Sequence, residues 1–141
     1  DHVPPFRTAA ADTAVFRLTR TGVMVGTLPY MAPEQFHDAR SADVRADVYS
    51  FGIVLFQMLT GRLPFRGDTV AKLERQHCRA DPPSVVPAIP RRFAREAGRI
   101  DEIVRRCLAK DPADRYATIP DLRRALTESL RRIDRRFDPR R

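Results

Sequence analysis

The sequence of 141 residues has no tryptophan, only two cysteines, six glycines and two lysines. Cys78 and Cys107 stand apart, without a C-x-x-C pair or a histidine at ligand spacing, which favours reduced thiols over a disulfide or a metal site. No apolar run approaches the roughly 20 residues of a membrane-spanning helix, and nothing resembles a signal peptide. We therefore expect one globular, cytoplasmic domain that binds no metal.

Arginine, by contrast, is abundant, with 24 residues and a net charge of +8. Such a surplus permits contact with nucleic acid, acidic lipid or acidic protein segments. The arginines are spread along the chain and do not alternate with aromatic residues, as a base-stacking surface requires. We therefore expect solvated helix faces and no specific nucleic acid. Arginine makes up eight of the last nineteen residues, so residues 131–141 are predicted to be a basic tail that could lie near a membrane.

The strongest local pattern is the segment 47–60, DVYSFGIVLFQMLT. Nine of the twelve residues that follow Asp47 are apolar, and they surround the helix, so we expect it to be buried on every side. Asp47 suits the N-terminal cap with Ser50 in the first turn, and Gly61 suits the C-terminal cap. This segment is the predicted core helix of the domain.

Three further helices are predicted from spacing and caps. One runs over 69–79 with Asp68 as its cap, one runs over 92–109, and the last begins after Thr118. Four prolines within 81–90 predict an extended loop. The last helix has an apolar stripe made of Leu122, Leu126, Leu130, Ile133 and Phe137. The fold class is therefore mainly α, without a convincing sheet.

Three blocks of sequence resemble one known family: GTLPYMAPEQ at 26–35, RADVYSFGIVLFQMLTGRLPF at 45–65 and LAKDPADRY at 108–116. They follow one another in the order and at the spacing of the large lobe of a eukaryotic-type (bacterial Hanks-type) serine/threonine protein kinase. The resemblance implies the large helical C-lobe of the protein-kinase-like fold, lacking the N-terminal β-rich lobe.

The resemblance also suggests three parts of the chain. We expect a weakly ordered N-terminal segment at 1–18, a partial protein kinase domain at 19–130 that holds the activation segment and the C-lobe helices, and the basic tail at 131–141. Residue 1 is aspartate, not methionine, which suggests that the chain starts inside a longer reading frame.

In this family an Ala-Pro-Glu motif, here ending in Glu34, closes the activation segment. The resemblance implies that Glu34 pairs with Arg115, because a planar guanidinium can grip a carboxylate with two parallel hydrogen bonds. The preceding loop resembles the one that positions the protein substrate, and Thr27 is similar to the serine/threonine-specific branch. This substrate-positioning loop comprises Gly26, Thr27, Leu28, Pro29 and Tyr30. A turn that merely needs glycine and proline would fit the same residues.

Two threonines and one aspartate complete the sites that the resemblance implies. Thr19 and Thr21 lie where related bacterial kinases carry activating phosphothreonines, and a phosphate there would need arginine partners to order the loop. Asp47 resembles the residue that holds the catalytic loop from the core helix, or it serves only as the helix cap.

The parts that handle nucleotide are missing from this sequence. It contains no G-x-G, no strand lysine of the required type, no H-R-D-x-x-x-x-N and no D-F-G. We therefore expect no catalytic and no cofactor-binding residue in this chain, and ATP and Mg²⁺ are implied only for an intact parent kinase. Without the elements that cover it in the family, part of the core helix should face solvent or a partner protein. The candidates are Phe51, Ile53, Val54, Leu55, Phe56 and Met58.

Two main functions remain open from the sequence. The first is the C-terminal part of a serine/threonine protein kinase, an ATP-dependent transferase in signal transduction that acts on a protein substrate. The second is a pseudokinase-like scaffold that binds a partner over the core helix and performs no transfer. A third, weaker reading uses the basic tail on nucleic acid or acidic membrane, as in the cytosolic part of a membrane-anchored receptor kinase.

Overall fold

The computed structural model describes residues 28–38, 40 and 42–134, with side chains up to Arg131. Within these ranges the chain is helical and has no strand, which confirms the mainly α prediction. In chain order the elements are η2 (Leu28–Tyr30), α1 (Pro33–His37), α2 (Val44–Thr60), α3 (Val70–Arg79), η4 (Val86–Ala88), η5 (Arg91–Phe93), α4 (Ala94–Cys107), η6 (Pro112–Asp114) and α5 (Ile119–Asp134). None of these helices is both long and apolar enough to cross a bilayer.

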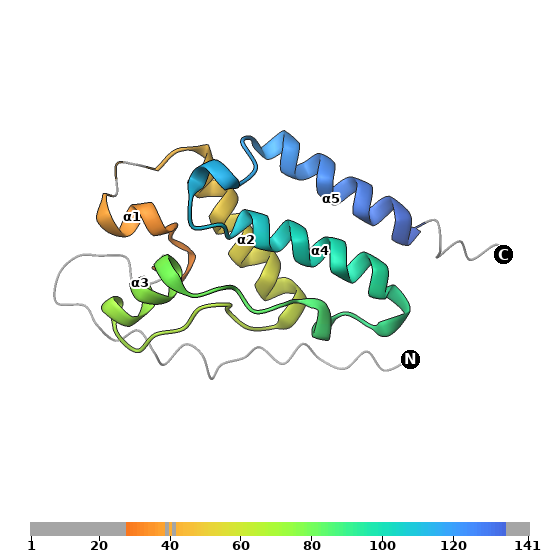
Figure 1. Cartoon of the computed structure of the whole chain (residues 1–141), viewed down its shortest axis with the longest axis horizontal. Helices are drawn as coiled ribbons and strands as arrows, with labels where there is room; N and C mark the ends of the chain where they lie inside the picture. Colours follow the sequence, from red (N-terminus) through yellow and green to blue (C-terminus); the bar gives the residue numbers. More distant parts are fainter. Residues whose placement is uncertain (1–27, 39, 41, 135–141) are drawn as a thin grey trace, which may run out of the picture.

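The helices pack around α2 and α4 (Figure 1). α4 contacts both α2 and α5, and the connection that contains η4 lies against α4. α1 and α3 contact each other at the opposite end of the molecule from the free end of α5 (Figure 1). η2 contacts α2 and α3, so the segment that leads into α1 is held by both of these helices.

The ends of α2 are set by Asp43 and Gly61. The Asp43 carboxylate accepts a hydrogen bond from the Arg45 N–H at 2.8 Å and caps the helix. The prediction that Asp47 is the cap is therefore wrong, since the helix begins three residues earlier and Asp47 is an exposed residue of its first turn. Gly61 ends the helix as predicted, with a left-handed backbone (φ 73°) that side chains rarely adopt.

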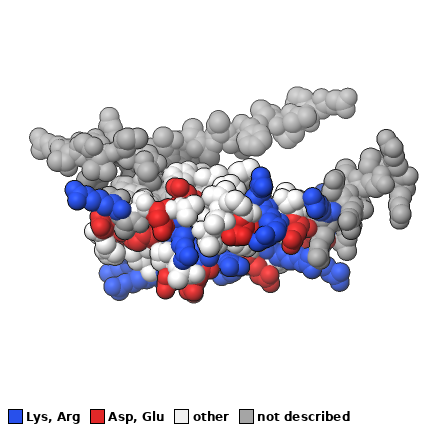
Figure 2. Space-filling model, turned by 90° about the horizontal axis from the view of Figure 1, so that it is seen from above, with Lys and Arg blue, Asp and Glu red and all other residues white. Residues whose placement is uncertain are grey.

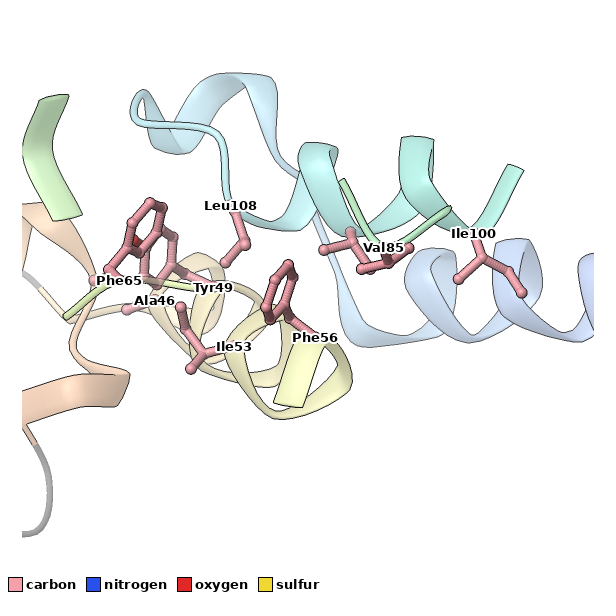
Figure 3. Packing of buried hydrophobic residues seen from close by; sticks show 10 residues of the cluster. Ala46, Tyr49, Ile53, Phe56, Phe65, Val85, Ile100 and Leu108 are labelled. Atoms are coloured by element: carbon pink, nitrogen blue, oxygen red, sulfur yellow. The ribbon is translucent and has the colours of Figure 1, made fainter. Parts of the chain in front are cut away.

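The buried core lies between α2 and α4 and the connections beside them (Figure 3). Its members from α2 include Tyr49, Ile53 and Phe56, none of which is exposed to solvent. Gly52 lets the two helices approach closely, because a Cβ built on it would lie 2.6 Å from Cβ of Cys107. A second cluster joins α2 and α4 to α5 and contains Val48, Ile103, Cys107, Tyr116 and Leu122.

One side of α2 is not buried. Phe51 is 41% exposed, Val54 39% and Met58 78%. The prediction that the helix is buried on every side is therefore wrong, whereas the expectation that part of the apolar set faces solvent is confirmed. Of the six candidates, Ile53 and Phe56 are buried. We call Asp47, Phe51, Val54 and Met58 the α2 stripe.

The N-terminus of α3 and the connection after it differ in detail from the sequence prediction. Thr69 caps α3, with its hydroxyl accepting from the Lys72 N–H at 3.2 Å, whereas Asp68 forms an exposed ion pair with Lys72 at 2.8 Å. The proline-rich connection is not extended throughout, since it contains the short turn η4. Its backbone is held by Asp101 of α4, which accepts from the Val85 N–H at 2.7 Å.

α5 begins as predicted but faces the core differently. The Thr118 hydroxyl donates to Asp121 at 2.7 Å and accepts from the Asp121 N–H at 3.2 Å, a capping arrangement. Leu130, predicted in the apolar stripe, is 56% exposed, and Ser129 is buried in its place. At 3.6 residues per turn, Ser129 lies about 20° from Leu122 around the helix, whereas Leu130 lies about 80° away. The side chain of Ile133 and all of Phe137 lie outside the described residues.

Candidate functional site

The most completely paired side chain of the described residues is that of Arg115, which is 2% exposed. Its two terminal nitrogens donate to the two carboxylate oxygens of Glu34 at 2.7 and 2.8 Å. The predicted ion pair is therefore present, and it has the two-pronged geometry that only arginine offers. It links α1 to the turn that follows η6 across 81 residues of sequence.

The remaining donors of Arg115 bind backbone carbonyls. Nε donates to Ala109 at 2.8 Å, and the terminal nitrogens donate to Arg45 at 3.0 Å and Lys110 at 3.2 Å. All five N–H groups of the guanidinium are thus used, and its flat face lies 4.9 Å from the ring centroid of Tyr49. We call this set of contacts the Arg115 junction. It ties α1, the start of α2 and the connection after α4 to one point.

The backbone contacts of this junction, and the hydrogen bonds that hold η2, were not anticipated from the sequence. Ser50 of α2 donates to the Tyr30 carbonyl at 2.7 Å, and the Tyr30 hydroxyl donates to the side-chain carbonyl of Gln57 at 2.8 Å. Ser50 therefore anchors η2 and does not cap α2. A signal was available, because Ser50 and Gln57 are polar residues spaced by seven in an otherwise apolar helix and therefore share a face.

η2 contains the three described residues of the predicted substrate-positioning loop. Pro29 is buried, while Leu28 and Tyr30 are partly buried. The chain then turns into α1, whose first residue is Pro33 and whose N-terminus is closed by Gln35: the Gln35 side chain accepts from the Ala32 N–H at 2.9 Å. η2 and the Glu34 carboxylate are therefore fixed relative to each other and to α2.

Four predicted site residues lie outside the described residues. They are the loop residues Gly26 and Thr27 and the candidate phosphosites Thr19 and Thr21. Their roles stay predictions. Asp47 is described, and it lies exposed on the α2 stripe.

A buried histidine lies beside the Arg115 junction. Nδ1 of His77 shares a hydrogen bond with the Tyr49 hydroxyl at 2.8 Å. The centroid of its ring lies 5.0 to 5.7 Å from the ring centroids of Phe36, Tyr49 and Phe65. Burial, with help from the charge of Lys110, lowers the pKa of His77 to about 4. The imidazole is therefore neutral at physiological pH and serves the packing of α3 against α2.

Lys110 is a second basic side chain whose pKa is lowered by burial. Its ammonium group lies 4.2 Å from the ring centroid of Phe65, a cation–π contact. Burial lowers the pKa of Lys110 to about 8. Its backbone carbonyl also accepts from Arg115, so this lysine belongs to the same buried region.

On the exterior, acidic and basic side chains are interspersed over the face shown in Figure 2. Among the described residues, exposed ion pairs also form within one helix, such as Arg124 with Asp121 at 2.7 Å. On that face the described arginines therefore do not gather into a single basic patch.

The described helices form a lobe built on α2. A short helix begins with Pro33 and Glu34, and an arginine from a turn after α4 binds this glutamate through two hydrogen bonds. Together these features define the large lobe of a protein kinase. A family model described as "Protein kinase domain" matches residues 12–127. The chain belongs to this family.

Three bacterial serine/threonine-protein kinases illustrate the similarity. PknL of Mycobacterium tuberculosis is 41% identical over 107 residues, which cover 74% of this chain and 25% of PknL. Pkn1 of Myxococcus xanthus is 43% identical over 115 residues, covering 79% of this chain and 15% of Pkn1. PknB of Mycolicibacterium smegmatis is 42% identical over 115 residues, covering 82% of this chain and 17% of PknB. The chain thus spans a quarter or less of the length of these relatives.

Proposed function

We propose that this chain forms the substrate-side part of a serine/threonine protein kinase domain, whose activity is transfer of a phosphoryl group from ATP to a protein serine or threonine. The observation that carries the proposal is the contrast between the fully paired Arg115 junction and the open α2 stripe. At the junction every donor of the Arg115 guanidinium is paired within this chain. The stripe, by contrast, exposes three apolar side chains that no described residue covers.

The α2 stripe follows one line along the helix. At 3.6 residues per turn, Asp47, Phe51, Val54 and Met58 fall within about 60° of one another. A helix whose other faces are packed and whose remaining face carries three exposed apolar side chains indicates a second body that covers it. We propose that this body is the other part of the kinase domain, with Asp47 holding the backbone of its catalytic loop.

The substrate-positioning loop would act beside the α2 stripe, because Ser50 and Gln57, which hold η2, lie within about 60° of Val54 around the helix. Ser50 and Gln57 hold η2, the described part of this loop, in place, so a protein substrate would meet a fixed backbone there. Thr27, which lies outside the described residues, is proposed to contact the catalytic aspartate of the intact kinase. Phosphoryl transfer depends mainly on positioning, so a rigid loop is the contribution expected of this part.

The described residues do not fit a site for ATP and Mg²⁺. Magnesium in kinases is held by oxygen ligands, above all carboxylates. Within the described ranges, the one group of three or more metal-binding side chains is His37, Glu74 and Cys78, which offers one carboxylate, one imidazole and one thiol. We therefore assign nucleotide and magnesium to the other part of the domain and derive no step through them here.

The proposed location is the cytoplasm, where ATP and protein substrates meet. The basic tail at 131–141 is mostly outside the described residues, and its proximity to a membrane stays a prediction. A protein substrate is the proposed partner, since transfer to protein serine or threonine follows from the family.

A chimera tests the function. This chain replaces the matching segment of Mycolicibacterium smegmatis PknB, and transfer of the ATP γ-phosphate to a serine- and threonine-containing protein is measured. We expect transfer by the chimera and none by this chain alone, which should also show no saturable binding of ATP with magnesium.

Two variants separate the possible outcomes. Asp47→Ala in the chimera should lower transfer while the protein stays folded, whereas the exposed Asp114→Ala, matched in type, should not. A folded chimera that binds ATP but transfers nothing would support the scaffold function instead. Saturable ATP binding by this chain alone would overturn the assignment of nucleotide to the other part of the domain.

A further inference from the structure

Three side chains capable of binding a metal ion meet where α1 contacts α3. His37 is the last residue of α1, and Glu74 and Cys78 lie on α3. One ligand atom from each lies within 4.8 Å of the other two, and Nδ1 of His37 lies 3.7 Å from a carboxylate oxygen of Glu74. The sequence prediction that Cys78 has no histidine at ligand spacing holds along the chain but not in space, because His37 is 41 residues away.

The helix backbone of α3 places two of these side chains so that both can bind one metal ion. Glu74 and Cys78 are four residues apart on a helix and therefore project from the same face. Around a tetrahedral zinc ion, neighbouring ligand atoms lie about 3.5 Å apart, so the three groups need to close by roughly 1 Å. The side chain of His37 is 71% exposed and can rotate to do so, whereas Cys78 is held in place from one side, with its sulfur 3.9 Å from the Pro33 carbonyl.

A fourth ligand position also exists. The three groups border an open hollow of about 280 Å³ that is lined in addition by Ala71, Arg75 and Arg79. Water can enter such a hollow, and three protein ligands with one water is a common coordination of zinc. The two arginines oppose a cation, so affinity must come from the bond to sulfur and nitrogen and not from the local charge. This favours zinc-like ions over magnesium or calcium.

We propose that His37, Glu74 and Cys78 bind a zinc-class divalent ion that joins the end of α1 to α3. Binding releases the thiol proton of Cys78, and the thiolate and the Glu74 carboxylate together balance the charge of the ion. Because α1 also carries Glu34, the ion would hold the segment that follows the substrate-positioning loop from a second side. The ordinary alternative is an exposed contact between His37 and Glu74 at 3.7 Å, which solvent screens and which adds little to stability.

Cobalt titration of the reduced, full-length chain tests the proposal, since a cobalt–thiolate bond gives a charge-transfer band in the near ultraviolet. We expect one equivalent of Co²⁺ to bind with this band, Zn²⁺ to displace it and Mg²⁺ to leave it unchanged. Cys78→Ser should abolish the band, and His37→Ala and Glu74→Gln should each weaken binding at least about tenfold. Glu128→Gln, an exposed glutamate on α5, is the matched control and should bind as the unmodified chain does.

Three results would overturn the proposal. The first is a folded, reduced chain that shows no cobalt–thiolate band, and the second is a band that survives Cys78→Ser, which would assign it to Cys107. The third is an unchanged affinity in His37→Ala. This variant decides the matter where Cys78→Ser does not fold, because His37 is exposed and its loss does not disturb the core.

Discussion

The Arg115 junction and the α2 stripe lie on different sides of the same helix. The junction is a buried charge that is fully paired, whereas the stripe carries apolar side chains that are exposed. At the junction a buried charge has every donor satisfied by residues of this chain, and two of those partners are more than 65 residues away in sequence. On the stripe, Phe51 and Met58 are large apolar side chains left to solvent by the described residues. Among the described residues, the buried arginine is thus fully paired within this chain, whereas one face of α2 carries large apolar side chains that stay exposed.

The most severe test of the comparison is Arg115→Ala. It removes both hydrogen bonds from Arg115 to the Glu34 carboxylate and those to three backbone carbonyls, and we expect the free energy of unfolding to fall by about 3–5 kcal/mol. Arg115→Lys should recover only part of this loss, because a lysine ammonium cannot make two parallel bonds to a carboxylate. Urea unfolding followed by circular dichroism measures both.

Arg124→Ala is the control for this test. Its pair with Asp121 is exposed and local to α5, so a change below about 0.5 kcal/mol is expected. Equal losses for Arg115→Ala and Arg124→Ala would mean that the junction is no more important than a surface pair.

The second test measures how stability depends on pH through His77, the buried histidine of α3. The pKa of His77 is lowered from the ordinary 6.5 to about 4 in the folded protein, so the unfolded chain binds the proton more readily. Stability should therefore be fully present above pH 6.5 and fall between pH 6.5 and about 4, by up to about 3 kcal/mol. Urea midpoints measured across this range give the slope.

One histidine variant isolates this contribution from that of the carboxylates. His77→Asn retains a hydrogen-bonding group toward Tyr49 but does not titrate, so the slope between pH 6.5 and 4 should flatten. A slope that persists in His77→Asn would assign the acid sensitivity to other groups.

The third test concerns the packed side of α2. Gly52→Ala places a methyl group 2.6 Å from Cβ of Cys107, so we expect a loss of about 1–3 kcal/mol as α2 and α4 are forced apart. Gly98→Ala is the matched control in α4, where the new methyl group meets nothing within 4 Å. It should stabilise the helix by up to about 1 kcal/mol, since alanine is the better helix former. Thermal melts of the two variants should shift in opposite directions.

The sequence predicted the features that depend on composition and spacing along the chain. The apolar run marks α2, Gly61 marks its end, and the three kinase-like blocks place Glu34 opposite Arg115. It could not place the start of α2, because Asp43 and Asp47 are both good caps and only the path of the preceding chain decides between them. The same holds for Asp68 and Thr69 at α3.

Other features depended on contacts between distant segments. Leu130 was misplaced because the apolar pattern of α5 allows two stripes, and packing against α4 selects the one through Ser129. The three carbonyls around Arg115 and the meeting of His37 with Cys78 arise only when α1, α2 and α3 come together. The contacts of Ser50 and Gln57 were also missed, although the spacing of these two polar residues in an apolar helix was a usable signal.

The variant with the smallest expected effect on this chain, Met58→Gln, compares the α2 stripe with the buried side of the same helix most directly. Met58→Gln changes the most exposed apolar residue of the α2 stripe to a polar one of similar length, and we expect the free energy of unfolding to change by less than about 0.5 kcal/mol. Phe56→Ala, two residues away on the buried side, should cost about 3–5 kcal/mol. In the PknB chimera, however, Met58→Gln should lower thermal stability, because there the stripe would be covered. A loss in this chain as large as that of Phe56→Ala would instead make the stripe part of the core, whereas a loss confined to the chimera locates the missing cover on this face.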